Sequence, residues 1–550
     1  MFSFLKINLP ILIIILILFS YLGIKTLDED GWDGWGFGSA QTLMSSRYWA
    51  RDGFIKNYFL FIPSPYSKLV QYLDSPEFRN HPIETLNGAL NRNRIYYTHY
   101  PSLYLVPFAA IAKIGFTSRF VFRILALIIS LSGLIFFYWF IKLISDKTTA
   151  LVASIYYGFS FTFLNYADSL ANQSFNILFA FLILTLSVLA SRNFENRKIY
   201  ARYNFAIWLV YFTLALSSYD TTFFVFVWLV LYDAIILKKF LWQKWLFWTS
   251  APILGFSLQI IQNTWYLGWA DAMRDIYTSY TGRAIGSLKN FILGLIMPFV
   301  SMTSLKTIFI FKKTVVALTS AAAIFGILWK FRQRIGLDAN YFKIIFILAV
   351  AAVAQPFFIN VTGHWSYQGV LTAPFWGLLI GTASVGLLQY IAVLKYSKER
   401  TLFMILFLIV LGLWFVRFYD TFGYVKDWPN NRPDQKVIEF SREIKKLYPN
   451  EERIAFRIIP KNPILKSQFP TFNFEYYLGM PKIDFANSHD LLVDFWWFRN
   501  ISEYPFYSFI IAENKSDIEK IRQELIIKNL KNISPIMNIQ EQYLFTVGPK

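Results

Sequence analysis

The stretch "LPILIIILILFSYLGIKTLDEDGWDGW", residues 9 to 35, joins an almost unbroken apolar run to a segment with four carboxylates and two tryptophans. A helix needs about 20 apolar residues to cross the hydrocarbon core of a bilayer, and this run is long enough. Lys6 precedes it and no small-residue cleavage site follows, so we predict a retained membrane anchor and not a signal peptide. The acids that follow either form the solvated end of the membrane helix or belong to an active site, and the rest of the sequence is needed to distinguish these two roles.

The composition indicates an integral membrane protein. Of 550 residues, 55% are hydrophobic and only 16% are charged, whereas about a quarter of the residues in an ordinary soluble domain are charged. The net charge of +19 comes from short basic clusters between apolar spans and not from one basic face, so we predict no nucleic-acid partner. With no cysteine and four histidines, the chain offers no thiolate site and little for a zinc cluster.

The basic clusters predict the topology, because short loops rich in lysine and arginine stay in the cytoplasm. These clusters are Lys142/Lys147, Arg192/Arg197/Lys198/Arg202, Lys238/Lys239/Lys244, Lys330/Arg332/Arg334 and Lys395/Lys398/Arg400. The spans that satisfy this rule are 8 to 26, 120 to 141, 148 to 164, 173 to 191, 203 to 218, 221 to 237, 246 to 262, 314 to 330, 343 to 360, 369 to 394 and 401 to 418. We predict an all-α polytopic bundle in the plasma (inner) membrane, with a cytoplasmic N-terminus and an extracytoplasmic C-terminus.

Two further apolar pieces, residues 101 to 116 and 291 to 311, bear on the number of spans. A crossing by only one of them would move several basic clusters outside, so we predict interfacial or re-entrant helices on the outer face. If both crossed, the bundle would have about 13 spans instead of about 11.

The tail from residue 421 changes character. It shows an amphipathic helix pattern, three strand-like segments ("RIAFRIIP", "YSFIIAEN" and "EQYLFTVG") and a second helix with Ser516 as its predicted N-cap. We therefore predict a membrane domain over residues 1–420 and a small extracytoplasmic α/β domain over residues 421–550. The first outer loop, residues 27–119, is expected to carry juxtamembrane helices.

Polar residues gather at the predicted outer ends of the spans. They are Asp28, Glu29, Asp30 and Asp33 in the first loop, then His99, Asp168, Asn172, Gln173, Asp220, Asp271, Asp275, His364 and Tyr367. An ion-coupled transporter would place ionisable residues near the middle of the membrane, and this chain does not clearly do so. The pattern favours an enzyme whose active site lies at the outer face of the membrane. The alternatives are a lipid-linked glycan flippase or transporter and a non-catalytic membrane scaffold.

Several motifs follow one another in a recognisable order. They are the acidic stretch after the first span, "SAQTLMSSRYWARDGF" (39–54), "YTHYPSLYLVPF" (97–108), "NYADSLANQSFNILFAFLILTL" (165–186) and "GHWSYQGVLTAPFWGLLIG" (363–381). Their order resembles the membrane glycosyltransferases of the protein O-mannosyltransferase and aminoarabinose-transferase type, glycosyltransferase family 39, which have the GT-C fold. The resemblance implies an active site on the outer face, a polyprenyl-phosphate-linked sugar as donor, and no metal cofactor.

The resemblance also implies a catalytic acid in the first loop. Asp28 and Glu29 match the family's Asp-Glu pair by residue type, whereas Asp33 matches it by distance from the segment that contains Arg51. We favour Asp33 as the base, because it lies nearer the juxtamembrane helix that would hold it rigidly, and keep Asp28 and Glu29 as the alternative. Together with Asp30 these acids could bind a divalent cation, but we do not predict one.

Two further motifs imply substrate-binding residues. "THYPSLY" resembles the family's His/Lys-Pro-Pro-Leu-Tyr signature, with Ser102 in place of the second proline, and implies that His99 and Tyr100 face the outer cavity. The family's second-loop acid falls at Gln173, which cannot act as a base. Either Asp168 supplies that carboxylate from five residues upstream, or this protein uses only one acid.

The departing phosphate needs cationic groups, and arginine binds two of its oxygens at once. The outer-face candidates are Arg47, Arg51, Arg274, Arg283 and Lys306, of which Arg283 is the best placed. A single displacement, with a carboxylate aligning the acceptor, inverts the anomeric centre. The expected partners are a polyprenyl-phosphate sugar, an unknown acceptor (protein, lipid or glycan) and membrane lipid.

Overall fold

The structure is a computed structural model. It describes residues 9–27, 36–62, 83–84, 90–91, 96, 98, 101–238, 241–284, 325–326, 329–330, 332, 338–358, 372–394, 398, 400–405, 407–408, 411, 435–449, 453–458, 482–485, 491, 507–527, 532–540 and 542–548. Contacts divide the chain into two units, which are described separately. The helical unit comprises Met1–Trp35, His99–Phe108 and Phe116–Pro429, and the sheet unit comprises Gly36–Thr98, Ala109–Gly115 and Asn430–Lys550.

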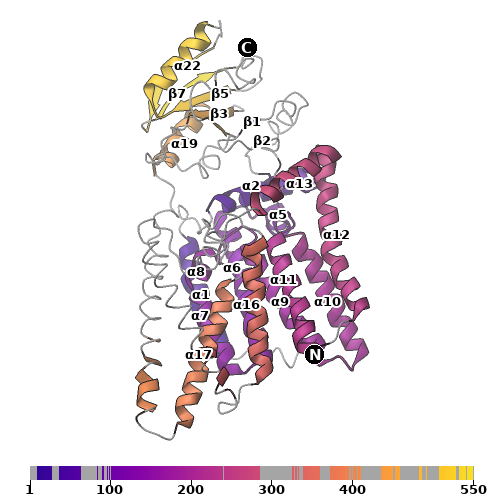
Figure 1. Cartoon of the computed structure of the whole chain (residues 1–550). Coiled ribbons are helices and arrows are strands. Elements are labelled where there is room, and N and C mark those ends of the chain that lie inside the picture. The colour runs from indigo at the N-terminus through magenta and orange to yellow at the C-terminus, as the bar shows by residue number, and fades with distance from the viewer. Residues whose placement is uncertain are drawn as a thin grey trace. The chain divides into compact units, whose positions relative to one another are not determined.

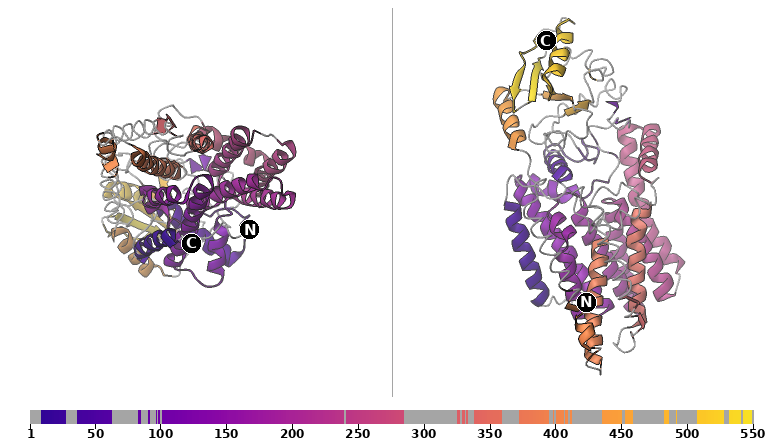
Figure 2. Two further views of the ribbon diagram at one scale, coloured as in Figure 1. Left: turned by 90° about the horizontal axis from the view of Figure 1, so that it is seen from below. Right: turned by 60° about the vertical axis from the view of Figure 1, so that its left-hand side comes forward.

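Long helices make up the helical unit and pack side by side (Figures 1 and 2). They are α1 (Leu9–Leu27), α6 (Arg119–Ile144), α7 (Lys147–Gly158), α8 (Phe161–Tyr166), α9 (Gln173–Arg192), α10 (Arg197–Ala215), α11 (Tyr219–Leu231) with its π-helical continuation η2 (Tyr232–Leu237), α12 (Trp242–Leu267), α13 (Trp269–Ala284), α16 (Ala339–Phe358) and α17 (Thr372–Val393). Five helical segments in the described part of the chain are long and apolar enough to cross a membrane. They are Leu9–Leu27, Arg119–Ile144, Gln173–Arg192, Tyr219–Leu237 and Ala373–Ala392. The prediction of an integral membrane protein is confirmed.

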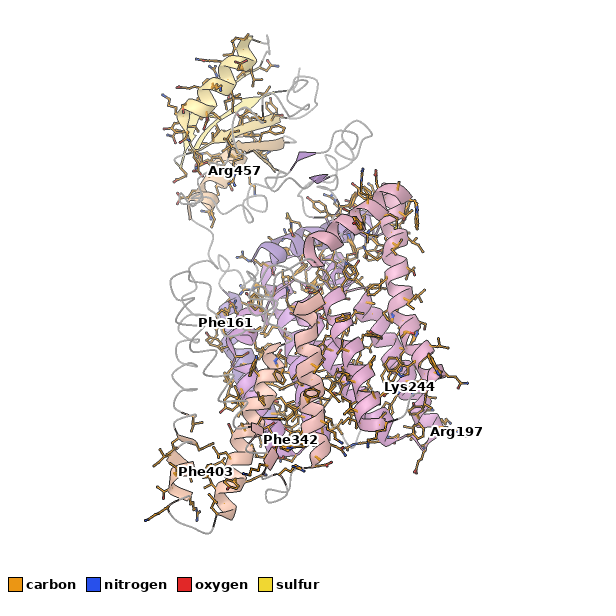
Figure 3. All side chains as sticks on the ribbon, viewed as in Figure 1. Phe161, Arg197, Lys244, Phe342, Phe403 and Arg457 are labelled. Atoms are coloured by element: carbon orange, nitrogen blue, oxygen red, sulfur yellow. The ribbon has the colours of Figure 1, made fainter. Side chains whose placement is uncertain are left out.

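The helices have two ends, which are named here by a residue at each. The Asp168 end contains the first residues of α6, α9 and α11, and the Lys244 end contains the last residues of α9 and the first residues of α10 and α12. Arg197 and Lys244 lie together at the latter end (Figure 3). The sequence-predicted spans 173–191 and 221–237 agree with α9 and with α11 plus η2.

One predicted span, residues 148–164, is not a single helix. It is split into α7, which ends at Gly158, and α8, which begins at Phe161. The side chain of Ser160 accepts a hydrogen bond from the backbone N–H of Phe163 at 3.2 Å, as an N-cap residue does. The break lets the chain turn before α9, and Asp168 lies in that turn.

The apolar segment 101–116 does not form a full crossing. Its helix, α5 (Leu105–Lys113), has nine residues, about 14 Å at 1.5 Å per residue, which is too short for a bilayer core. The second doubtful segment, 291–311, lies outside the described residues.

Close contacts at small residues hold neighbouring helices together. At Gly381 of α17, an added Cβ atom would lie 2.7 Å from the backbone nitrogen of Ala153 in α7. At Gly133 of α6, it would lie 3.0 Å from the backbone nitrogen of Leu178 in α9. Small residues let helix backbones approach closely in membranes, where helices gain little from the hydrophobic effect.

Aromatic side chains fill the centre of the helical unit. Phe137 of α6 packs edge-on against Phe181 of α9, with ring centroids 5.0 Å apart. Trp228 of α11 is fully buried, packs against Phe140 at 5.3 Å and donates its indole N–H to the hydroxyl of Ser187 at 3.2 Å. Ring contacts of this kind contribute about 0.5–1.5 kcal/mol each beyond area burial.

The sheet unit contains a five-stranded sheet with strand order β4-β3-β5-β7-β6. The strands are β3 (Arg453–Ile458), β4 (Lys482–Phe485), β5 (Tyr507–Ala512), β6 (Met537–Ile539) and β7 (Gln542–Val547). β3 pairs in parallel with β4 and β5, whereas β7 is antiparallel to β5 and β6. The predicted C-terminal sheet is therefore present, and its three predicted strands are β3, β5 and β7.

Two helices supply the rest of the hydrophobic core around the five-stranded sheet. From α19 (Gln435–Leu447), Phe440 and Ile444 pack with Phe509 and Leu544 of the sheet. The other helix, α22 (Lys515–Ile527), packs against β5 and β7 and buries Ile518, Ile521 and Leu525. The prediction that Ser516 is the N-cap of this helix is wrong, because the helix begins one residue earlier, at Lys515. Asn514 precedes it, and its carbonyl accepts the backbone N–H of Ile518.

A further helix, α2 (Gly36–Asp52), belongs to the same unit, as does a short antiparallel pair, β1 (Ile83–Glu84) and β2 (Leu90–Asn91). The hydroxyl of Ser45 in α2 donates to the carbonyl of Ile62 at 2.7 Å and accepts the N–H of the same residue at 2.9 Å. The indole N–H of Trp49 donates to the carbonyl of Leu60 at 2.9 Å. These bonds tie α2 to the loop that follows it.

Candidate functional site

A buried carboxylate lies in the turn between α8 and α9. The Asp168 side chain is 0% exposed, and its Oδ1 lies 2.8 Å from the Nζ of Lys25, near the end of α1. Its Oδ2 accepts the Nε–H of Arg123, in the second turn of α6, at 3.0 Å, and a second guanidinium nitrogen contacts the same oxygen. Asp168 thus joins α1, α6 and the α8–α9 turn. We call Asp168, Lys25 and Arg123 the ion triad.

Lys25 is held by more than the carboxylate. Its ammonium also donates to the carbonyl oxygens of Leu164 and Asn165, each at 3.3 Å. These carbonyls belong to the end of α8, where backbone acceptors have no partner within the helix and favour a cation. The short helix α8 therefore orients the lysine toward Asp168.

The charge state of Asp168 follows from these neighbours. Burial alone would raise the pKa of its carboxyl, but the ammonium of Lys25 and the guanidinium of Arg123 outweigh burial and lower that pKa below its ordinary range. Both carboxylate oxygens are engaged by cations. This arrangement suits a structural anchor better than a group that accepts a proton near neutral pH.

Next to the triad, buried polar atoms lack hydrogen-bond partners within the described part of the chain. They are Thr162 Oγ1, both amide atoms of Asn165, Gln173 Oε1 and Asn176 Oδ1. Gln173 and Thr162 line a cavity of about 20 Å³, together with Ser130, Tyr157 and Tyr166 among others. Such a volume holds about one water molecule or one ligand hydroxyl. We call these four residues, Thr162, Asn165, Gln173 and Asn176, the amide cluster.

The described part of the "THYPSLY" motif lies at the same end of the helical unit. The backbone N–H of Leu103 donates to the carbonyl of Leu216, at the end of α10, at 3.0 Å. At the same end, the side-chain amide of Asn172 donates to the carbonyl of Ser217 at 3.2 Å. Motifs far apart in the sequence therefore meet at the Asp168 end.

A ring contact extends this convergence. Phe108 of α5 stacks on Phe122 of α6 at 5.7 Å and meets Phe175 of α9 edge-on at 5.9 Å. The first half of α5 is thus fixed beside the start of α9, one turn from Gln173.

The other predicted site residues are distributed as follows. Arg51 lies at the end of α2, in the sheet unit, where its exposed guanidinium pairs with Asp52 at 2.9 Å and stacks on the ring of Tyr48 at 4.9 Å. Arg283 lies in the last turn of α13, and its side chain is outside the described residues. Asp28, Glu29, Asp33, His99, Tyr100, His364 and Tyr367 are also outside them.

The sequence did not single out Lys25 or Arg123. A signal for Arg123 was present, because a charged residue inside an otherwise apolar span needs a partner and marks a functional or structural site. In the part of the chain that the structure describes, no group of three or more His, Asp or Glu side chains is placed to hold a metal ion.

Comparisons with known proteins identify the fold. No protein-family model and no curated protein sequence matches the chain. Among solved structures, the chain is similar to ArnT from Cupriavidus metallidurans bound to undecaprenyl phosphate, with a TM-score of 0.59 and 12% identity over 98% of this chain and 99% of ArnT. It is also similar to the Archaeoglobus fulgidus oligosaccharyltransferase in complex with zinc and sulfate, with a TM-score of 0.51 and 10% identity over 96% of this chain and 71% of that one. Both are GT-C glycosyltransferases, so the predicted GT-C fold is confirmed.

Proposed function

We propose that the chain is a glycosyltransferase that transfers a sugar from a polyprenyl-phosphate-linked donor to an acceptor on the outer face of the membrane. The observation that carries this proposal is the fold shared with ArnT over nearly the whole of both chains. ArnT is bound there to undecaprenyl phosphate, a lipid phosphate of the kind that the donor would release. The match extends through the C-terminal sheet unit, since it covers 98% of this chain.

The proposed reaction is a single inverting displacement. The acceptor oxygen or nitrogen attacks the anomeric carbon as the bond from that carbon to the phosphate oxygen breaks, and the acceptor proton passes to a carboxylate. The polyprenyl phosphate leaves as an anion. We assign Asp33 as the base, with Asp28 or Glu29 as the alternative. Arg51 and Arg283 are assigned to stabilise the phosphate, and His99 and Tyr100 to bind the substrate in the outer cavity.

The contacts of the ion triad support a mechanism with one catalytic carboxylate and not two. Asp168 is fully buried and engaged at both oxygens, so we assign it a positioning role. Gln173 and the other members of the amide cluster have donors and acceptors beside Asp168 that find no partner among the described residues. A sugar has hydroxyls that complement such groups, and we propose that Gln173 binds the donor sugar together with His364 and Tyr367.

The proposal includes an orientation and a domain division. The N-terminus and the Lys244 end are placed in the cytoplasm, because the Lys244 end contains basic clusters such as Arg197/Lys198/Arg202. The Asp168 end and residues 421–550 are then extracytoplasmic, and residues 1–420 form the transferase domain. We propose that the reaction needs no divalent cation.

The test is transfer by the purified full chain in nanodiscs, assayed with a panel of labelled polyprenyl-phosphate sugars and candidate acceptors, with and without EDTA. We expect one donor to be used, EDTA to have no effect, and Asp33→Asn to lower turnover by about 100-fold or more, as loss of a general base does. Asp275→Asn is the matched control, because it removes another acid predicted to lie at the outer face. If Asp33→Asn is fully active, Asp28→Asn and Glu29→Gln take its place in the test.

Two results would overturn the proposal. Absence of transfer with every donor would remove the enzyme assignment. Movement of a labelled lipid-linked glycan across the bilayer without transfer would identify the alternative, a flippase.

A further inference from the structure

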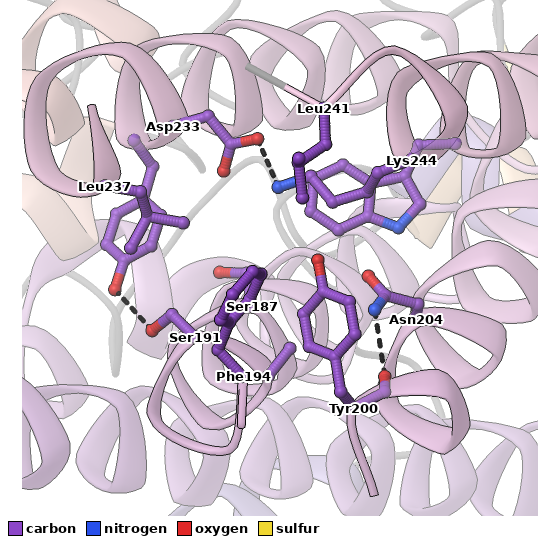
Figure 4. A pocket seen from close by; sticks show the side chains of 12 residues that line it. Ser187, Ser191, Phe194, Tyr200, Asn204, Asp233, Leu237, Leu241 and Lys244 are labelled. Atoms are coloured by element: carbon purple, nitrogen blue, oxygen red, sulfur yellow. Dashed lines mark hydrogen bonds and ion pairs between the residues drawn. The ribbon is translucent and has the colours of Figure 1, made fainter. Parts of the chain in front are cut away.

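A cavity at the Lys244 end of the helical unit lies away from the proposed transfer site. Its volume is about 140 Å³, and it is lined by the end of α9, by η2 and by the first turns of α10 and α12 (Figure 4). Ser187 and Ser191 line it from the end of α9, whereas Gln173 is the first residue of that helix. A helix of 20 residues is about 30 Å long, so the two sites are separate.

Opposite charges meet inside this cavity. Asp233 of η2, whose side chain is 1% exposed, forms an ion pair with Lys244 of α12, which is 8% exposed. The ammonium of Lys244 also lies over the ring of Trp248, 4.3 Å from its centroid. Burying two charges costs desolvation free energy that the pair rarely recovers in full, and π-helical turns occur frequently at functional sites. The pair is therefore a candidate for ligand recognition.

Neutral polar atoms complete the lining. Asn204 Oδ1 and Trp248 Nε1 are buried and have no hydrogen-bond partner among the residues that the structure covers. The amide nitrogen of Asn204 donates to the carbonyl of Tyr200 at 2.9 Å, which fixes the amide in place. The cavity thus presents a free acceptor and a free donor beside a carboxylate and an ammonium.

The residues at the edge of the cavity are amphipathic. Phe194 and Leu241 line it and are 40% and 38% exposed. Exposed cations stand a few residues away along the chain, namely Arg197 and Lys198 before Tyr200, and Lys238 after Leu237. Basic pockets between membrane helices at the cytoplasmic side bind the phosphate groups of lipid headgroups.

We propose that this cavity binds the headgroup of a phospholipid that carries both a phosphate and a primary ammonium, of the phosphatidylethanolamine class. The ammonium donates to Asp233 and to Asn204 Oδ1, while the phosphate accepts from Lys244 and from the indole N–H of Trp248. A choline headgroup has no N–H to donate, and a purely anionic headgroup does not use Asp233. The exposed Phe194 and Leu241 contact the acyl region, which favours a lipid over a soluble phosphate ester.

The test is lipid binding to the purified, delipidated full chain in detergent, measured by native mass spectrometry. We expect phosphatidylethanolamine to bind at least tenfold more tightly than phosphatidylcholine or phosphatidylglycerol with the same acyl chains. Asn204→Leu should remove this preference, as should the charge-neutral double variant Asp233→Asn/Lys244→Gln. Lys343→Gln is the control, since it removes a lysine from α16 that does not line the cavity.

Equal binding of the ethanolamine and choline lipids to the wild type would overturn the proposal, as would an unchanged preference in Asn204→Leu. That variant removes no charge, so it decides the matter if the double variant does not fold. Glycerophosphoethanolamine that binds as tightly as the lipid would overturn the assignment to a membrane lipid. None of these readouts depends on sugar transfer.

Discussion

Replacing Asp168 by asparagine is expected to destabilise the protein strongly. The carboxylate accepts charge-assisted hydrogen bonds from Lys25 at 2.8 Å and from Arg123 at 3.0 Å, and each such bond contributes about 1.5–3 kcal/mol. The substitution leaves the guanidinium of Arg123, 1% exposed, without its counter-ion. Removing one partner of a buried pair costs about 3–5 kcal/mol, and we expect a loss in that range.

The assay is equilibrium unfolding in detergent, with a double-mutant cycle of Asp168→Asn, Arg123→Met and both together. If the two residues act as a buried pair, the double variant loses much less than the sum of the single variants. Asp271→Asn is the matched control, because its ion pair with Arg274 has a similar length of 2.8 Å but is 39% and 54% exposed. Exposed pairs contribute about 0–1 kcal/mol, so this control should barely change stability.

Measurements of sugar transfer, and of stability as a function of pH, distinguish a structural anchor from a catalytic base at Asp168. If Asp168 is an anchor, the double variant recovers transfer that Asp168→Asn loses, whereas a base cannot be recovered in this way. Because the pKa of Asp168 is lowered in the folded protein, its stabilisation is present above the ordinary carboxyl pKa of about 4 and is lost as the pH falls through the lowered value. A loss below about 1 kcal/mol in Asp168→Asn would refute the reasoning.

Three further predictions concern single side chains. Gln173→Leu should lower transfer at least tenfold in the glycosyltransferase assay while leaving the unfolding midpoint unchanged or higher, because the Gln173 carbonyl is buried without a partner among the described residues. Gly381→Ala should cost about 1–3 kcal/mol in detergent unfolding, since the new Cβ meets the backbone of α7, whereas Gly23→Ala, with nothing within 4 Å, should cost little. Asp146→Ala removes the N-cap of α7 and should cost about 1 kcal/mol. Burial raises the pKa of Asp146, but hydrogen bonds from Thr149 and Thr148 outweigh burial and lower that pKa. The difference in stability between wild type and Asp146→Ala, measured by unfolding at several pH values, should therefore vanish as the pH falls below the carboxyl range.

The positions of several membrane helices could be predicted because lipid imposes one rule on every span. Apolar length and the basic clusters gave spans 173–191 and 221–237, which correspond closely to α9 and to α11 with η2. The division of span 148–164 could not be predicted in this way. It depends on whether Ser160 caps a new helix or continues the old one, and tertiary packing decides between those states.

The candidate site was predictable only in part, because its contacts are not local. Asp168 and Gln173 stand together in one motif, so the sequence located them. The partners of Asp168 lie 143 and 45 residues away, on α1 and α6, and no local pattern encodes those pairings. Without these partners Asp168 is a candidate base, and with them we propose that it is an anchor.

Hydrogen-bond satisfaction therefore distinguishes two kinds of polar residue at the Asp168 end. In the ion triad, Asp168 is engaged by both cations and each cation is engaged by Asp168, which is what folding alone requires of a buried charge. Gln173 and Asn165, a few residues away, have buried polar atoms without partners among the residues that the structure describes. Such atoms cost about 1–3 kcal/mol each, a cost that apolar side chains of similar shape would avoid. The described contacts of the fold do not satisfy these atoms, whereas a ligand rich in hydroxyl groups would. Under the proposed function, we therefore expect the neutral amides beside Asp168, and not its carboxylate, to bind the sugar.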